Sequence, residues 1–458
     1  MSPIPSRQKL LQAIAAVLVL AYALRYLLPS LSAGFASDDP MNIRYYWNHG
    51  LWQTVLHIPV YFTTFQRPVG GLFYLILFKL FHLNPWPYHL ALIGLLLLNC
   101  WLFFRFARLL TGSAVVAALA ALPVAFHPRS AQLAYMPSYV FDVLCFTFFI
   151  LTLDYYMRAR AGGPLTRRQT AVLLVLQTVA FGAKEMAVTM PVLLLICELF
   201  FYKLDRRSIL PLLLSFAATL PAVLGKAFGS DTLLNIAPYQ PVFTAGRFFE
   251  FSLRFITDFL IRLSPPRWPL LLLLGLAALL PAIFLRRPAL RWLCCAIVIV
   301  PLPIAFLPAR DGGALYLPIA FCSLLAACLA AEFMQSPWLR RVPPAILVVP
   351  LACYFIMHVE RDNNRVSTML KGFNQPTAQV IAQIQAIQPS VPPGSAIYIA
   401  NDPYSGWDAQ FLFELQYADP TVRVHLGRHV PLQPEEIALM DYVFTFEGNR
   451  LLRIRGSR

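Results

Sequence analysis

The first residues of this sequence whose types suggest chemistry are two adjacent aspartates, Asp38 and Asp39, in the segment FASDDP. Neighbouring carboxylates repel each other, so a cation, a role as a base or a helix N-terminus is needed to stabilise them. Asp is also a preferred cap for a helix, here one that would begin near Met41. The pair therefore predicts a general base, a helix cap, or one carboxylate in each role.

A second pair of charges, Lys184–Glu185, interrupts an apolar region. Charges in apolar surroundings are costly, and they usually pair or serve a site. Neighbours along a helix do not face each other, so we expect each of these two residues to have another partner. His127–Pro128–Arg129 and Asp142 form a further polar group, for which a structural role at a helix end remains open.

Arg310 precedes Asp311 and the segment Leu315–Pro318. The guanidinium fork of an arginine suits phosphate oxygens because it can donate two parallel hydrogen bonds. It could equally reach lipid headgroups without binding a substrate. Carboxylates and cations of this kind favour chemistry on an anionic lipid, but they do not name the reaction.

The elements that must position these residues are membrane-spanning helices. Of 458 residues, 58% are hydrophobic and 13% are charged, and the mean hydropathy is +0.62. Soluble domains are about half apolar and about a quarter charged. We predict a polytopic α-helical membrane protein with about eleven transmembrane helices, because the apolar runs can cross a core about 30 Å thick. The predicted spans are residues 10–29, 86–104, 113–127, 138–157, 169–183, 186–202, 208–226, 268–285, 290–308, 314–334 and 343–358.

The basic residues set the expected orientation. They gather in short loops, which are typically cytoplasmic, so the N-terminus is expected inside and the C-terminus outside. Residues 360–458 hold nine Lys/Arg and ten Asp/Glu, so the formal charge of +15 comes from the membrane part. This charge therefore does not indicate a nucleic-acid partner; membrane lipids are the expected surroundings.

Two domains are expected: residues 1–359 in the membrane and residues 360–458 as a small external α/β domain. The first external loop covers 30–85 and the fourth covers 227–267. Each is expected to hold an interfacial helix, at 66–83 and 244–263, with an extra helical hairpin as the alternative. In the external domain we predict helices at 376–388 and 408–417, strands at 395–400 and 421–426, and a hairpin at 441–455.

Several segments carry a family resemblance, in one order along the chain. They are FASDDP, QRPVGGLFYLILFKLFHL at 66–83 with YHL at 88–90, FHPRSAQLAYMPSYVFDVL at 126–144, AKEMAVTMPVLLL at 183–195 and ARDGGALYLPIAF at 309–321. On these residues the chain resembles the GT-C glycosyltransferases, over roughly residues 30–335. The nearer likeness is to the transmembrane O-mannosyltransferases that carry tetratricopeptide repeats and to their bacterial relatives.

The resemblance implies inverting transfer of a hexose, with mannose as one candidate, from a polyprenyl-phosphate donor to an acceptor hydroxyl outside the membrane. Asp38 or Asp39 would be the general base, and Lys184 and Arg310 would hold the donor phosphate. Supporting site residues would be Arg67, His127, Asp142 and Glu185. The acceptor would be a protein or an envelope glycan or lipid, and no metal ligand is predicted, although a divalent cation remains open.

The sequence departs from the family at Ser130, Gln132 and Tyr139–Val140, and residues 360–458 contain no tetratricopeptide repeats. These departures leave the acceptor and any metal dependence open. A flippase for a lipid-linked intermediate and a non-catalytic membrane scaffold are the competing hypotheses. The Ala/Leu/Arg-rich composition favours a bacterial inner-membrane protein whose site and C-terminus face the periplasm.

Overall fold

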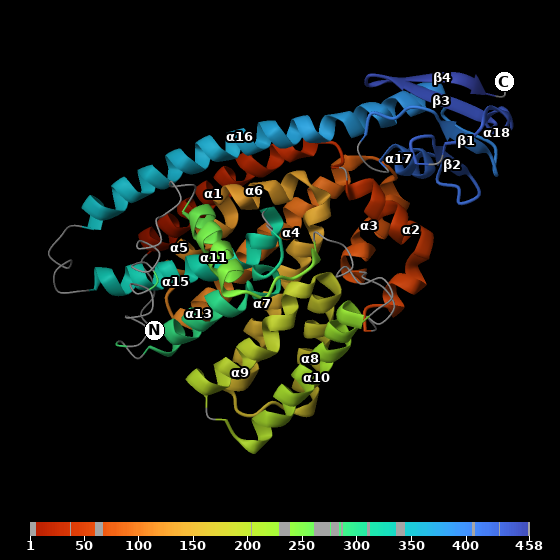
Figure 1. The fold of residues 1–458 in the computed structure, drawn as a ribbon. Helices are drawn as coiled ribbons and strands as arrows, with labels where there is room; N and C mark the ends of the chain where they lie inside the picture. Colours follow the sequence, from red (N-terminus) through yellow and green to blue (C-terminus); the bar gives the residue numbers. More distant parts are fainter. Residues whose placement is uncertain are drawn as a thin grey trace.

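The computed structural model describes residues 6–36, 38–59, 67–202, 204–228, 239–260, 275, 284, 287–308, 312–335, 344–404, 408–429 and 431–456. The molecule is a bundle of helices with a small α/β domain at one end (Figure 1). The α-helices are α1 Ser6–Leu27, α2 Asp38–Leu56, α3 Pro68–Phe81, α4 Pro85–Thr111, α5 Ala114–Phe126, α6 Pro128–Tyr135, α7 Val140–Ala161, α8 Arg167–Ala183, α9 Met190–Phe201, α10 Arg206–Phe228, α11 Ala245–Phe259, α13 Pro288–Ile299, α14 Leu302–Ala305, α15 Tyr316–Met334, α16 Pro344–Ile387, α17 Asp408–Tyr417 and α18 Pro434–Ala438. The 3₁₀ helices are η1 Leu28–Ser32, η2 Pro137–Tyr139, η3 Glu185–Thr189 and η6 Gly312–Leu315, and the strands are β1 Ala396–Ile399, β2 Arg423–Leu426, β3 Tyr442–Glu447 and β4 Arg450–Gly456.

Five helical segments in the described part of the chain are long and apolar enough to cross a membrane. They coincide with the predicted spans 86–104, 138–157, 208–226, 290–308 and 314–334. A sixth would be α5 with α6, which bend by 52° at His127 and coincide with 113–127. The chain is therefore a multi-pass membrane protein. Helices also form at 169–183 and 190–201, but α8 and α9 are shorter than a full span, and the predicted span 268–285 lies almost entirely outside the described residues.

Local signals explain several helix ends. The Asn84 side chain accepts a hydrogen bond from the amide of Trp86 and caps α4, and Gly112 ends that helix in the left-handed conformation at φ 69°. Only glycine adopts this conformation without steric cost. Thr166 and Gln169 form a reciprocal capping box at the start of α8.

Helix α3 forms within the segment predicted as an interfacial helix, residues 66–83, but one face of it is buried in the bundle. Two glycines make this approach close. A Cβ on Gly70 would lie 2.2 Å from the Phe141 ring, and a Cβ on Gly71 would lie 2.2 Å from the Tyr46 ring. The second predicted interfacial helix also forms, as α11, with Phe251 and Phe255 on its buried face.

The α/β domain has a four-stranded sheet in the order β2-β1-β3-β4. Strand β1 is parallel to β2 and β3, and β4 closes an antiparallel hairpin with β3 around Gly448. The two predicted strands, helix 408–417 and the hairpin are confirmed to within a few residues. The predicted helix 376–388 is different, because it is the last part of α16, which continues through Pro376 and across the expected domain boundary at residue 360.

Polar contacts fasten the α/β domain to the bundle. Arg44 of α2 pairs with Glu414 of α17, and its guanidinium lies over the Phe411 ring at 5.3 Å from the centroid. Along α16, Asn374 Nδ2 donates to the Tyr135 carbonyl at 2.6 Å, so this helix is also joined to α6. The domain is thereby joined to the helix that begins with the aspartate pair.

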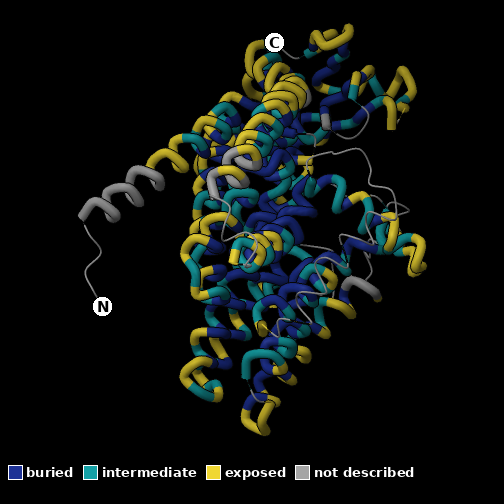
Figure 2. Tube along the Cα trace, turned by 90° about the vertical axis from the view of Figure 1, so that its left-hand side faces the viewer, coloured by how far each residue is buried: buried dark blue, intermediate teal, exposed yellow. Residues whose placement is uncertain are grey.

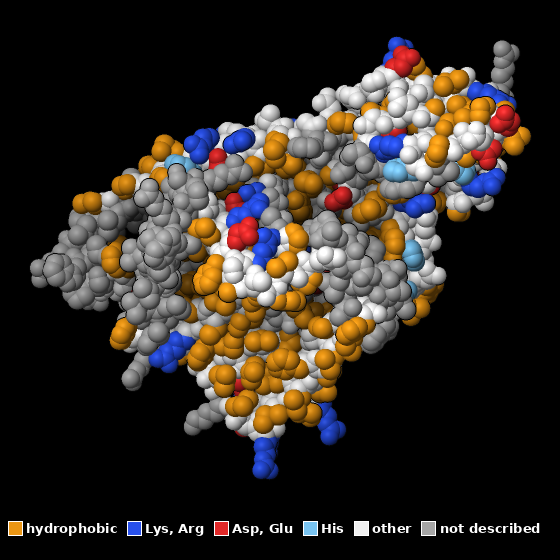
Figure 3. Space-filling view, in the orientation of Figure 1, with side chains coloured by type: hydrophobic (Ala, Val, Ile, Leu, Met, Phe, Trp, Pro, Cys, Tyr) orange, Lys and Arg blue, Asp and Glu red, His pale blue; other side chains and the backbone are white. Residues whose placement is uncertain are grey.

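Charged residues separate to the two ends of the bundle. At one end, the ends of α4, α7 and α9 meet through the pairs Arg105–Asp154 and Arg160–Glu198. Between the ends, hydrophobic side chains cover the face over α8, α9 and α10 (Figure 3). Buried segments run through the middle of the molecule, and exposed ones lie at its extremities (Figure 2). The other end holds the aspartate pair.

The close packing of α3 gives a test of the fold. We expect Gly70→Ala to lower the free energy of unfolding by about 1–3 kcal/mol, because the new methyl group would overlap the Phe141 ring. Gly94→Ala is the matched control: it lies within α4 with nothing within 4 Å of its Cβ position, so it should be neutral or slightly stabilising. The melting temperatures of the two variants are measured by thermal unfolding in lipid nanodiscs. Equal melting temperatures for Gly70→Ala and Gly94→Ala would contradict this packing.

Candidate functional site

The two adjacent aspartates have different surroundings. Asp39 is fully buried, and its carboxylate accepts hydrogen bonds from the Ala36 amide at 2.7 Å and from the Tyr74 hydroxyl at 2.8 Å. The bond to Ala36 ties the first turn of α2 to the loop before it, and the bond to Tyr74 joins α2 to α3. Asp38 is exposed at the start of α2. The structure thus places Asp39 in a buried supporting position and leaves Asp38 accessible to a substrate.

Loss of hydration raises the pKa of both carboxyls, but by burial of very different extent. Burial raises the pKa of Asp39 to about 7, against the two hydrogen bonds, which favour the charged form. Partial loss of hydration also raises the pKa of Asp38, although its side chain reaches solvent. A carboxyl with a raised pKa is a stronger proton acceptor once it is ionised, which suits a general base.

Four charged residues from three separate segments form a cluster that aromatic side chains connect to this pair. Arg67, which precedes α3, makes a bidentate bond with Glu185, at 3.2 Å from Nε and 3.0 Å from Nη2. Lys184 Nζ lies 2.5 Å from Asp142 Oδ1 at the start of α7. Lys184 and Glu185 therefore have separate partners, as the sequence predicted. We call Arg67, Asp142, Lys184 and Glu185 the charge cluster.

The charge cluster and the aspartate pair are connected by aromatic side chains. The Arg67 guanidinium lies 5.3 Å from the centre of the Phe141 ring, and that ring lies 6.0 Å from the Tyr74 ring. Tyr46 of α2 hydrogen-bonds to the Arg67 backbone at 3.2 Å. Sequence analysis did not single out these aromatics; the only signal was that Tyr74 and Phe141 lie inside the segments that carry the family resemblance.

His127 and Arg129 lie apart from Asp142, so the polar group expected from the sequence is divided. His127 Nδ1 accepts the Arg129 amide and so caps α6, while the Arg129 side chain pairs with Asp258 of α11 at 2.7 Å. These contacts give His127 and Arg129 a structural role in holding α11 against the bend between α5 and α6. His127 was predicted as a supporting site residue, but its hydrogen bonds go to Arg129 and Phe259 and none goes to the charge cluster.

Arg310 lies outside the described residues, but the residues after it lie near the site. At Gly312, φ is 63°, and an added Cβ would lie 2.4 Å from the Tyr139 hydroxyl and 2.8 Å from Gln132 Oε1. Gly313 is equally close to the Tyr139 ring. Tyr139 is three residues before Asp142, so the segment that follows Arg310 packs against the start of α7. The role of Arg310 stays a prediction.

A metal site was left open by the sequence. Among the described residues, no group of three or more His, Cys, Asp or Glu side chains is placed to hold a metal ion. The acids of the charge cluster are instead paired with Arg67 and Lys184. The question of a divalent cation is therefore still open for experiment.

The fold and site define a multi-pass membrane protein with a charge cluster among the ends of its helices. No known family profile matches the chain, and no curated protein matches it in sequence. In structure it is similar to ArnT from Cupriavidus metallidurans, solved bound to undecaprenyl phosphate, with a TM-score of 0.56 and 13% identity over 97% of this chain and 99% of that one. This likeness shows a shared fold, whereas the resemblance to the GT-C glycosyltransferases, and more nearly to the O-mannosyltransferases, stays a prediction.

The raised pKa of Asp39 predicts a pH dependence of stability. The folded state favours protonated Asp39, so its contribution is fully present below the ordinary pKa of 3.8 and is lost as the pH rises towards about 7. This loss can reach about 1.4 kcal/mol per pH unit. We expect the melting temperature of the wild type to fall more steeply between pH 4 and pH 7 than that of Asp39→Asn. Parallel melting curves for the two proteins would show that Asp39 does not titrate in this range.

Proposed function

We propose that this protein is a GT-C-type membrane glycosyltransferase that transfers a hexose from a polyprenyl-phosphate donor to an acceptor hydroxyl. One observation carries the proposal: the aspartate pair, with Asp38 exposed, is connected through Tyr74 and Phe141 to a charge cluster that holds two partly buried cations. The bundle around them has the fold of a protein bound to undecaprenyl phosphate. Which hexose is transferred is left to the donor assay below, with mannose as the first candidate.

Asp38 acts as the general base in this proposal. Its carboxylate accepts the proton of the acceptor hydroxyl while that oxygen attacks the anomeric carbon of the donor sugar. The bond between the anomeric carbon and the phosphate oxygen breaks, and its electron pair leaves with the polyprenyl phosphate. Attack opposite the leaving group inverts the anomeric configuration. A lipid phosphate leaves as a stable anion, so no strong general acid is required.

Arg67 and Lys184 bind the phosphate of the donor. The bond to Glu185 uses two of the five N–H donors of the Arg67 guanidinium, so Arg67 can also bind phosphate oxygens. Fixed cations lower the barrier as negative charge develops on the leaving group. Asp142 and Glu185 hold the two cations in place before the donor binds, and Arg310 is proposed as a third phosphate ligand.

The experiment uses the full chain in lipid nanodiscs with radiolabelled glucose, mannose and galactose on polyprenyl phosphate. We expect one donor to be consumed, and Asp38→Asn to lower kcat by about 10²- to 10⁴-fold with little change in donor KM. Arg67→Lys keeps the charge but loses the bidentate fork, so its donor KM should rise by about tenfold or more.

The control is Lys371→Met, an exposed cation on α16 far along the chain from the charge cluster, which should leave both constants unchanged. Melting temperatures of all variants are compared first, so that a loss of folding is not read as a loss of chemistry. An Asp38→Asn enzyme with wild-type kcat would remove Asp38 as the base, and the absence of turnover with every donor would contradict the proposed reaction.

A further inference from the structure

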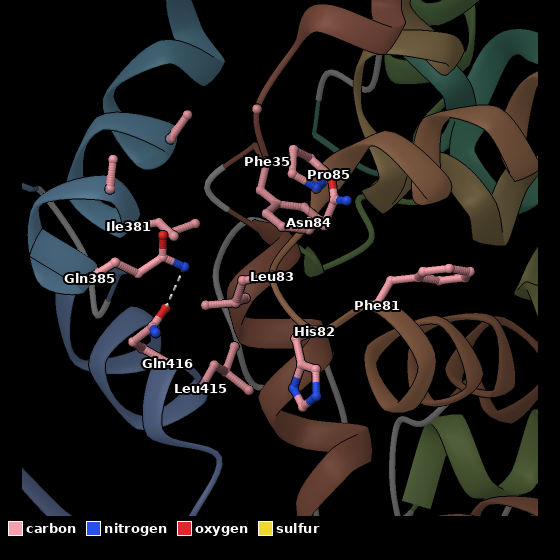
Figure 4. A pocket seen from close by; sticks show the side chains of 13 residues that line it. Phe35, Phe81, His82, Leu83, Asn84, Pro85, Ile381, Gln385, Leu415 and Gln416 are labelled. Carbon is pink, nitrogen blue, oxygen red and sulfur yellow. Dashed lines mark hydrogen bonds between the residues drawn. The ribbon is translucent and has the colours of Figure 1, made fainter. Parts of the chain in front are cut away.

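A cavity of about 430 Å³ lies between the α/β domain and the membrane bundle. One wall is the loop residue Phe35 and the turn His82–Asn84 between α3 and α4, and the other is formed by α16 and α17 (Figure 4). Pockets that bind small ligands commonly measure about 300–1,000 Å³. The reaction proposed above does not use this cavity.

The cavity is lined by amide, apolar and aromatic side chains and by His82. None of the described lining residues is Lys, Arg, Asp or Glu. Three amide side chains reach it, those of Asn84, Gln385 and Gln416, beside apolar residues such as Leu83 and Leu415. The one hydrogen bond between lining amides, from Gln385 Nε2 to Gln416 Oε1, is long at 3.4 Å (Figure 4). An amide offers both donors and acceptors, which matches the hydroxyls of an uncharged sugar.

Small residues and an unusual backbone keep the cavity open. Ala378 and Ala382 stand one helical turn apart on α16 and line the cavity, so at these two positions the helix contributes only a methyl group. On the opposite wall, His82 has φ 49°, which is uncommon for a residue other than glycine. Such strained residues concentrate at ligand sites, where the surrounding structure maintains them.

The cavity shares a wall with the loop that supports the aspartate pair. Phe35 lines it and is fully buried, and the next residue, Ala36, donates its amide to the Asp39 carboxylate. A molecule bound in the cavity would therefore lie on the other side of the loop that fixes the aspartate pair. This placement suits the acceptor rather than the donor, whose phosphate is assigned to the charge cluster.

We propose that this cavity binds a neutral carbohydrate, which is part of the acceptor. The proposal rests on the glycosyl-transfer function given above and names the class of its acceptor. A lipid chain is a poorer occupant, because it offers no hydrogen bonds to the amide atoms of Asn84, Gln385 and Gln416 that the bond to Trp86 and the bond between the two glutamines leave over.

The test measures binding of cellobiose, maltose and α-1,2-mannobiose to the full chain by saturation-transfer NMR and calorimetry. Lipid nanodiscs replace maltoside detergents, whose headgroups would compete. We expect at least one disaccharide to bind, and Ala382→Trp, which fills the cavity, to abolish that binding. Ala386→Trp is the matched control, because Ala386 is exposed on the same helix but does not line the cavity.

A second variant separates a sugar site from an apolar one. Gln385→Leu combined with Gln416→Leu should weaken a disaccharide by about tenfold through lost hydrogen bonds. Unchanged disaccharide binding in this double variant, unchanged binding in Ala382→Trp, or no binding of any probe would overturn the proposal.

The failure of this inference can be told from the failure of the proposed function. Binding is measured without donor, and Asp38→Asn should keep wild-type disaccharide affinity while losing transfer. Disaccharide binding by a protein that consumes no donor would support the cavity and contradict the transferase. Donor turnover by a protein that binds no disaccharide would support the transferase and contradict the sugar site in the cavity.

Discussion

The candidate site depends on one constraint: a charge that is removed from water must be paired. Arg67 and Lys184 both lie in partly buried positions, where an isolated cation would lose most of its hydration. Each is matched by a carboxylate from a different segment, so the pairing joins the start of α3, the start of α7 and the junction of α8 with η3. The charge cluster therefore helps to fix the helices as well as the chemistry.

This constraint also explains the different fates of the two aspartates. The interior next to the cluster can accept one carboxylate from α2 only with full hydrogen bonding, which Tyr74 and Ala36 provide for Asp39. The neighbouring carboxylate is then turned outward at the helix start. Two adjacent residues of the same type therefore have different tasks: Asp39 supports the helix, and Asp38 is the reactive group in the proposed mechanism. The support orients the helix, and the exposed group meets the substrate.

The sequence predicted the membrane class, the five spans that the structure supports and most elements of the α/β domain, because hydrophobic run length and strand alternation are local signals. It also predicted that Lys184 and Glu185 would have separate partners. It could not choose between Asp38 and Asp39, since burial depends on the distant residue Tyr74. It grouped His127 with Asp142, although Asp258 draws the His127 segment towards α11.

The continuity of α16 also escaped prediction, and for a physical reason. The apolar periodicity predicted a separate helix at 376–388, yet α16 continues through Pro376, and the turns before it contact α6, as in the bond from Asn374 to Tyr135. Tertiary contacts of this kind outweigh the local preference for a break. The long helix then sets the place of the whole α/β domain.

One uninterrupted helix of 44 residues links the α/β domain to the bundle. The length of this helix therefore fixes both the distance and the rotation of the domain relative to the bundle. Each residue inserted or deleted in such a helix would turn the domain by about 100° and move it by about 1.5 Å along the axis. Insertions and deletions in α16 should therefore be tolerated far less than in an ordinary linker. Relatives of this protein that keep the domain in the same place should differ there by whole turns of helix, while their surface loops vary freely.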